Sequence, residues 1–194
     1  SEFLRVHEDV VLGQQIDILG ASKNVEAMHK LKTGSYTMRG PLVLGATMAG
    51  GSSQLRALLT KFADPLGVAF QLRDDLLGTF GDPAETGKPV GNDIVAGKRT
   101  ALVEEVERLA NEDELRAWKS AFGRSDATEG AVAAATAAMI SSGARDAVEK
   151  RQIERCDQAR EMLDDPLFAA AVRPVLAGIV DAIRVSPRKP RVGS

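Results

Sequence analysis

Apolar residues in this chain recur at intervals of three and four along most of its length, and they rarely alternate one by one with polar residues. Intervals of three and four place side chains on one face of a helix, whereas alternation would indicate a half-buried strand. Alanine, the strongest helix former, occurs 28 times among the 194 residues. The sequence therefore predicts an all-α protein, and its length fits a single domain spanning residues 1–194.

Helix start and stop signals divide the chain into a series of expected helices. They cover residues 2–19, 24–48, 54–63, 65–80, 100–110, 113–122, 128–141, 144–163 and 166–184. Pro41 is expected to kink or split the second helix, because proline cannot donate a backbone hydrogen bond. Asp64 followed by Pro65 is expected to cap the start of the fourth helix, and Asp164 with Asp165 is interpreted as a second cap of this kind.

Charge and cysteine content narrow the classes of function. The chain has 25 Lys and Arg against 27 Asp and Glu, so it lacks the basic footprint of a nucleic-acid-binding protein. The single cysteine, Cys156, excludes an internal disulfide framework and fits a reducing compartment, so we expect a cytoplasmic protein.

The longest uncharged apolar run, 131–140, is too short for a transmembrane segment. The first residue is Ser rather than Met, so we expect a cleaved or truncated start.

An acidic pair in the fourth expected helix is the strongest chemical signal. Gln71, Asp74, Asp75 and Gly78 are three and four residues apart and share one helix face. Two carboxylates side by side repel each other unless a cation or a lysine neutralises them. The simple alternative is that the two aspartates lie on a solvated surface and bind nothing. Apolar neighbours and a mid-helix position, which capping cannot explain, favour a metal site instead.

A long loop, 81–97, follows this helix and contains four glycines and two prolines in seventeen residues. Lys88 and Lys98 each follow a glycine, with Asp93 between them, and such pairs favour phosphate binding. A nucleotide P-loop is excluded, because Asp82 and Asn92 occupy the positions where that motif needs glycine. Carboxylates on the helix and lysines on the loop point to a diphosphate bound through Mg²⁺, with an ordinary charged loop as the alternative.

Two earlier segments carry polar residues in an otherwise helical pattern. Lys32 and Tyr36 are one helical turn apart, and Gly34 between them suggests that another backbone approaches closely there. Gln14 and Asp17 are three residues apart in the first expected helix. Each of these features on its own is more typical of structure than of catalysis.

The motifs GQxxD, KTxxxY, FQxxDDxxG, TGKPxGND and GKRT occur in this order between Val10 and Thr100. Together they resemble the C-terminal half to two-thirds of the trans-isoprenyl (polyprenyl) diphosphate synthases, with the geranylgeranyl type as one possibility. The resemblance implies an all-α isoprenoid-synthase bundle, here without its N-terminal helices, that forms homodimers. It also implies a prenyltransferase that joins isopentenyl diphosphate to an allylic diphosphate with the help of Mg²⁺.

The resemblance also implies roles for individual residues. Asp74 and Asp75 correspond to metal ligands, with Asp74 as the more direct one. The residues that bind the substrate diphosphate correspond to Lys32, Lys88 and Lys98, with support from Tyr36 and Gln14. Those that stabilise the allylic cation correspond to Thr33, Gln71 and the carbonyl of Lys32, whereas Asp17 and Asp93 support the others without touching the substrate.

This sequence departs from the family pattern in three ways. Gly78 stands where the family has a third aspartate, and the spacing from Asp17 to Lys32 is short. The first aspartate-rich motif of the family does not occur in these residues, so we do not expect the chain as given to turn over by itself. Two alternatives to an elongating synthase therefore stay open, a non-catalytic partner subunit of a synthase and a terpene cyclase of the same fold.

Overall fold

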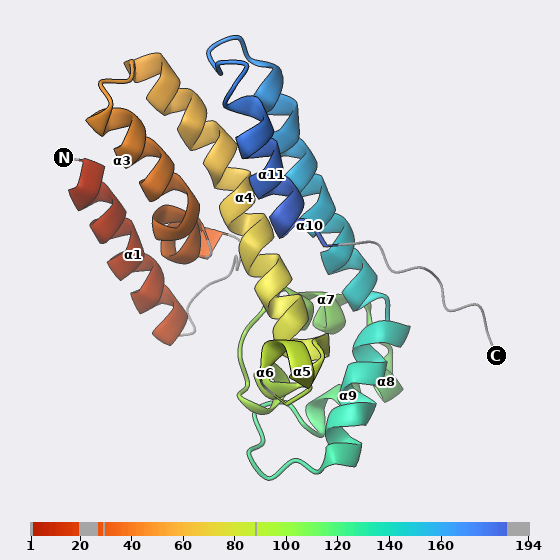
Figure 1. The fold of residues 1–194 in the computed structure, drawn as a ribbon. Helices are drawn as coiled ribbons and strands as arrows, with labels where there is room; N and C mark the ends of the chain where they lie inside the picture. Colours follow the sequence, from red (N-terminus) through yellow and green to blue (C-terminus); the bar gives the residue numbers. More distant parts are fainter. Residues whose placement is uncertain (1, 20–26, 29, 88, 186–194) are drawn as a thin grey trace.

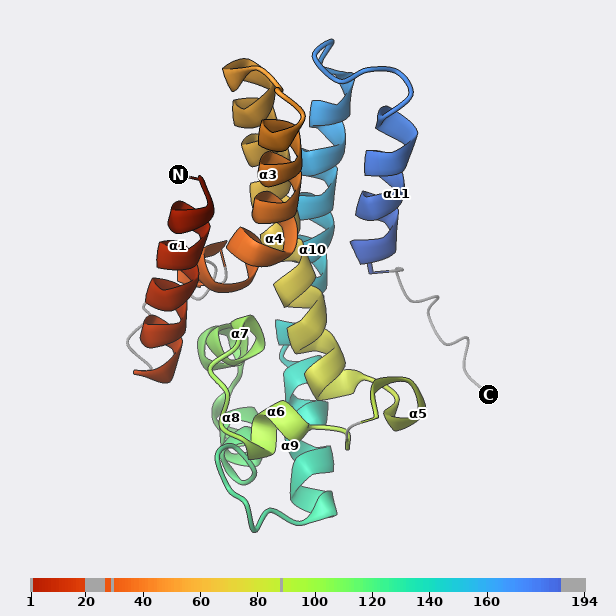
Figure 2. The same cartoon turned by 60° about the vertical axis from the view of Figure 1, so that its left-hand side comes forward.

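The computed structural model describes residues 2–19, 27–28, 30–87 and 89–185, and every regular element within them is a helix. The all-α prediction is therefore confirmed. The helices α1, α3, α4, α10 and α11 lie side by side in the upper part of Figure 1, and a second group, α5 to α9, surrounds the lower end of α4. We call α5 to α9 the lower helices. Figure 2 shows the same division after a rotation of 60°. None of the described helices is long and apolar enough to cross a membrane.

The elements have the following bounds. The upper group contains α1 (Glu2–Ile18), the π-helix η1 (Lys30–Arg39), which continues into α3 (Gly40–Met48), α4 (Ser53–Phe80), α10 (Ala144–Glu161), the 3₁₀ turn η2 (Met162–Asp164) and α11 (Arg173–Ile183). The lower helices are α5 (Pro83–Thr86), α6 (Asn92–Val95), α7 (Ala101–Leu109), α8 (Glu112–Lys119) and α9 (Glu129–Ser141).

The central helix α4 is longer than the sequence predicts. It runs through Pro65 without a break, so the prediction of two helices over 54–63 and 65–80 is wrong. Its N-cap is Ser52, whose side chain accepts a hydrogen bond from the Leu55 N–H, while Asp64 forms an ion pair with Lys30 at 2.6 Å. Proline in a helix interior costs about 3 kcal/mol, and burial of the apolar residues on both sides of Pro65 offsets that cost.

Two further expectations about helix boundaries are wrong. The last helix, α11, begins at Arg173 rather than at 166. Asp165 caps a turn and not a helix, because its Oδ1 atom accepts the Leu167 N–H at 2.9 Å and turns continue to 172. This turn places Phe168 edge-on against Phe62 of α4, with the ring centroids 6.0 Å apart, so tertiary packing holds the segment out of a helix.

The element η1 explains the glycine at position 34. A Cβ atom built on Gly67 of α4 would lie closer to the Gly34 Cα than the 3.0 Å that real Cβ atoms keep. The close backbone approach expected at Gly34 is therefore confirmed, and the approaching backbone belongs to α4. The π-helix changes to an α-helix at Gly40 with Pro41 in the first turn, which confirms the split at that proline.

Two buried clusters of apolar side chains meet along α4. The upper cluster joins its first half to α10 and α11, and its members include Phe62, Leu66, Cys156 and Val180. The lower cluster joins its second half to the lower helices, and its members include Leu72, Val106, Trp118 and Met139. Because α4 belongs to both clusters, the residues 71–78 near its C-terminal end are held on a rigid support.

Candidate functional site

The acidic pair predicted from the sequence lies on one face of α4, at the level of the lower cluster. Asp75 is fully buried, whereas 59% of the Asp74 side chain is exposed. Gln71 lies one turn earlier, and its Nε2 atom donates to Asp74 Oδ2 at 3.2 Å and to Asp75 Oδ1 at 3.1 Å. The predicted common face is thus confirmed, and Gln71 holds both carboxylates in a fixed relation.

Lys98 brings the loop to this face. Its Nζ atom lies 3.1 Å from Asp75 Oδ1, 3.1 Å from Asp93 Oδ2 and 3.7 Å from Asp74 Oδ2. Three carboxylates from two separate segments therefore converge on one ammonium group. The structure brings together five of the site residues expected from the sequence, namely Gln71, Asp74, Asp75, Asp93 and Lys98.

Burial and neighbouring charges shift the pKa values of two residues in this cluster, Asp75 and Lys98. Burial raises the pKa of Asp75 from its ordinary value of 3.8 to about 6, although Lys98 and Gln71 act in the opposite direction. Burial also lowers the pKa of Lys98, but the charges of Asp75 and Asp93 outweigh that effect and raise its pKa well above its ordinary value. Lys98 is therefore a permanent cation, and three carboxylates around it leave the face net negative.

The segment that carries Asp93 packs against α4 and the lower helices. The Gly91 N–H donates to the Thr79 carbonyl at 3.1 Å, and Gly91 has a φ of +73°, which favours glycine. Ile94 is buried in the lower cluster, and its carbonyl accepts the Gly123 N–H at 2.9 Å. The predicted long loop therefore contains two short helices and has a defined course beside the acidic face.

Gly78 contacts Asp93 across this junction. A Cβ atom built on Gly78 would lie 2.5 Å from Asp93 Oδ2, 2.7 Å from Cγ and 3.0 Å from Oδ1. The carboxylate of Asp93 thus occupies the space next to α4 where any side chain at position 78 would begin. The sequence placed Gly78 on the helix face of Asp74 and at the position of a missing aspartate, and no local signal in the sequence relates it to a residue fifteen positions later.

The other expected site residues are described in part. Gln14 on α1 and Tyr36 on η1 are both exposed, and neither joins the cluster around Lys98. Lys88 lies outside the described residues. The backbones of Asp17, Lys32 and Thr33 are helical, but their side chains lie outside what the structure describes.

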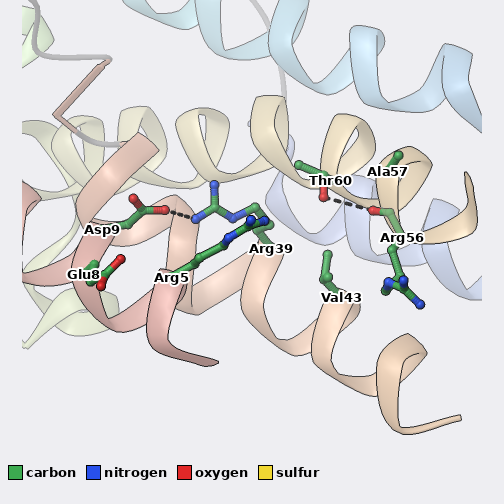
Figure 3. A pocket seen from close by; sticks show the side chains of 8 residues that line it. All are labelled: Arg5, Glu8, Asp9, Arg39, Val43, Arg56, Ala57 and Thr60. Carbon is green, nitrogen blue, oxygen red and sulfur yellow. Dashed lines mark hydrogen bonds and ion pairs between the residues drawn. The ribbon is translucent and has the colours of Figure 1, made fainter. Parts of the chain in front are cut away.

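A hollow that the sequence did not predict lies between α1, α3 and α4 (Figure 3). It has a volume of about 360 Å³, and its lining residues include Arg5, Asp9, Arg39 and Arg56. Arg39 forms an ion pair with Asp9, which joins the end of η1 to α1, and donates to Ser35 Oγ at 3.2 Å. None of the acidic residues of α4 lines this hollow, so it is separate from the cluster around Lys98.

The donor set on α4 fits a magnesium ion only with help from a ligand. Among the residues that the structure describes, no three His, Cys, Asp or Glu side chains are arranged to hold a metal by themselves. Mg²⁺ in proteins commonly uses one or two carboxylates together with water and substrate phosphates. Asp74 and Asp75 supply such a pair of carboxylates, so the chemistry of the face fits Mg²⁺ carried by a phosphorylated substrate.

A family model of polyprenyl synthetases matches residues 1–139 of the chain. The chain belongs to the polyprenyl synthetase family. A geranylfarnesyl diphosphate synthase of Aeropyrum pernix is 34% identical over 157 residues, which are 80% of this chain and 48% of that protein. A geranylgeranyl diphosphate synthase of Mycobacterium tuberculosis is 50% identical over 60 residues, which are 31% of this chain and 17% of that protein.

Solved structures of the family agree with the fold. A geranylgeranyl pyrophosphate synthase from Corynebacterium glutamicum, complexed with isoprenyl diphosphate and magnesium, superposes with a TM-score of 0.85 at 34% identity. The superposition covers 94% of this chain and 54% of that one. The chain thus spans about half the length of the relatives that it matches, and the family resemblance in the sequence is confirmed.

Proposed function

We propose that the protein is a prenyltransferase that condenses isopentenyl diphosphate with an allylic diphosphate. The single observation that carries this proposal is the convergence of Asp74, Asp75 and Asp93 on Lys98 at a rigid end of α4. A cluster of this kind suits a diphosphate that arrives with a divalent cation. The relatives named as geranylgeranyl diphosphate synthases support a product of that type.

The residues divide into groups by role. The proposed ligands of Mg²⁺ are Asp74 and Asp75. The proposed diphosphate-binding residues are Lys32, Lys88 and Lys98, supported by Gln14 and Tyr36. The groups proposed to stabilise the allylic cation are Thr33, Gln71 and the Lys32 carbonyl, while Asp17 and Asp93 position the others. The magnesium complex of the Corynebacterium glutamicum relative supports the assignment of the metal.

The chemistry follows from where charge develops. As the bond between the allylic carbon and oxygen breaks, the leaving diphosphate gains negative charge, so positive groups aimed at it bind the transition state better than the substrate. Bound Mg²⁺ supplies a Lewis acid for that charge. Lys98 supplies a fixed ammonium beside the leaving group, and Gln71 keeps Asp74 and Asp75 oriented by donating to both.

We further propose that these 194 residues form one half of the catalytic clamp and that the active protein is a homodimer. The chain alone is expected to be inactive, because the family's first aspartate-rich motif does not occur in its residues. Helix α1 exposes a row of large apolar side chains, which supports the proposal that another protein surface covers this helix. These are Leu4, Val11, Leu12 and Ile18, and the exposed Leu19 follows directly after the helix.

The test is product analysis of the full-length protein with isopentenyl diphosphate and dimethylallyl, geranyl or farnesyl diphosphate, with and without Mg²⁺. We expect elongation that stops when the metal is removed. Asp74→Asn should lower kcat by about 100-fold or more, on the scale of a lost transition-state contact. Asp164→Asn, which changes an exposed aspartate of η2 outside the cluster around Lys98, is the matched control and should leave kcat unchanged.

Three results would count against the proposal. Elongation without a divalent cation would remove the assigned role of Asp74 and Asp75. Full activity of Asp74→Asn would show that the acidic face does not bind the substrate complex. Absence of turnover by the full-length protein, together with binding to a complete synthase, would identify a non-catalytic partner subunit instead.

A further inference from the structure

We infer that Gly78 and Asp93 form a matched pair, in which the space left by the missing side chain on α4 admits the loop carboxylate that positions Lys98. The inference rests on the proposed function and deepens it, because it assigns a positioning role to two residues of the same site. It replaces the expectation that Gly78 is merely a lost aspartate.

The steric part of the argument is the contact between the two residues. Real Cβ atoms essentially never lie closer than 3.0 Å to another heavy atom, and a Cβ atom at position 78 would lie 2.5 Å from Asp93 Oδ2. Two more atoms of the same carboxylate would lie at 2.7 and 3.0 Å. Only glycine at position 78 therefore allows Asp93 to occupy its observed place.

The second part concerns the backbone around Asp93, which leaves that residue little freedom to withdraw. On one side the Gly91 N–H is bonded to the Thr79 carbonyl, directly after Gly78 in α4. On the other side Ile94 is buried in the lower cluster. With the backbone of Asp93 anchored in this way, a side chain added at position 78 would have to turn the Asp93 carboxylate away from α4, and the contact of that carboxylate with Lys98 Nζ would be lost.

The electrostatic part concerns Lys98, which Asp93 holds at two points. The Asp93 carbonyl accepts the Lys98 N–H at 3.0 Å, and Asp93 Oδ2 accepts from Lys98 Nζ at 3.1 Å. The first contact fixes where the lysine leaves the loop, and the second directs its ammonium toward Asp75. Asp93 is only 12% exposed, so water competes weakly for this contact.

The consequence is that the third carboxylate of the acidic face comes from the loop rather than from α4. A helical aspartate would be carried by α4 whatever the loop does. An aspartate on the loop makes the acidic face depend on the position of residues 91–98, because Asp93 and Lys98 both belong to that segment and contact each other. Binding of a diphosphate at Lys98 therefore depends on the fit between the loop and the bare helix surface at Gly78.

The experiment is a double-mutant cycle on the full-length protein with Gly78→Ala, Asp93→Ala and the two combined. Gly178→Ala in α11 is the matched control, because it also adds one methyl group to a helical glycine but meets no atom within 4 Å. We expect Gly78→Ala to lower the midpoint of urea unfolding relative to Gly178→Ala. Adding Asp93→Ala to Gly78→Ala should raise the midpoint again, because it removes the overlapping carboxylate.

A second readout separates positioning from simple packing. Mg²⁺ with inorganic pyrophosphate should raise the thermal midpoint of the wild type and of Gly178→Ala. That shift should shrink in Asp93→Asn, which keeps the shape of the side chain and loses its charge. In kinetics, Asp93→Asn should raise KM for the allylic diphosphate about tenfold with a smaller change in kcat, as expected for a residue that acts through Lys98.

The outcomes distinguish this inference from the proposed function. Additive effects of Gly78→Ala and Asp93→Ala on unfolding would overturn the matched pair, whatever the activity. An unchanged pyrophosphate shift and KM in Asp93→Asn would overturn its positioning role. If the effects of Gly78→Ala and Asp93→Ala on unfolding are not additive but the protein elongates no allylic diphosphate, the steric pair stands and the proposed prenyltransferase activity is rejected. If Gly78→Ala fails to fold, folding of the double variant supports the pair and its failure opposes it.

Discussion

The crossing of α4 and η1 offers the sharpest test of the packing. Gly67 and Gly34 bring the two backbones so close that a Cβ atom on Gly67 would overlap the Gly34 Cα. Carbon atoms meet comfortably at about 3.5–4.0 Å, so a methyl group closer than 3.0 Å must push the elements apart by at least about 0.5–1 Å. Gly67→Ala is therefore expected to separate η1 from α4.

The size of the effect follows from two opposing contributions. Alanine is about 1 kcal/mol better than glycine in a helix interior, whereas overpacking costs about 1–3 kcal/mol. Gly178→Ala gains the first contribution without the second, because open space surrounds that position. The free energies of unfolding of the two variants, measured in urea, should therefore differ by about 1–3 kcal/mol, with Gly67→Ala the less stable.

The same substitution should affect catalysis in the full-length protein. The element η1 carries Lys32 and Thr33, directly before the crossing glycine. A displacement of about 1 Å in catalytic groups can cost about 100-fold in rate, so kcat/KM should fall steeply in Gly67→Ala and stay unchanged in Gly178→Ala. Equal stability and equal activity of the two variants would refute the close crossing and the reason given for Gly34.

Two further predictions concern stability. Pro65→Ala should raise the free energy of unfolding by about 2 kcal/mol in urea, because it restores a hydrogen bond inside α4; a loss would mean that the helix does not continue through this position. Hydrogen bonds from Ser141 and from the Asn111 backbone lower the pKa of Glu114 below its ordinary 4.5. Stability from Glu114 is then present above pH 4.5 and lost as the pH falls through the lower folded value, so urea midpoints of Glu114→Gln should depend less on acid than those of the wild type.

Local signals predicted much of the helical framework. The helices expected to begin at Thr100 and Thr128 begin one residue later, because each threonine is the N-cap and its side chain accepts a hydrogen bond from a backbone N–H of the first turn. Pro65 and Asp165 misled the same reasoning. Their environment is decided by residues far along the chain, such as Phe62 against Phe168, which no capping rule includes.

The candidate site divides in the same way. Sequence alone placed Gln71, Asp74 and Asp75 on one helix face, because their spacing matches the helical repeat. It also named Asp93 and Lys98 as charged loop residues. It could not predict that Lys98 pairs with the carboxylates, or that Asp93 lies against Gly78, since both depend on how the loop packs on α4.

The amino-acid order by itself determined the helical class, the apolar faces and the chemical groups available at the acidic face, because these depend on neighbours within one or two turns. The tertiary structure decided which of those groups meet. Burial of Ile94 beside α4 carries Asp93 and Lys98 to Asp75, and two bare glycines, Gly67 and Gly78, admit the segments that approach that helix. Long-range burial and steric fit act between residues distant in sequence, so their outcome emerges only when the whole chain is packed.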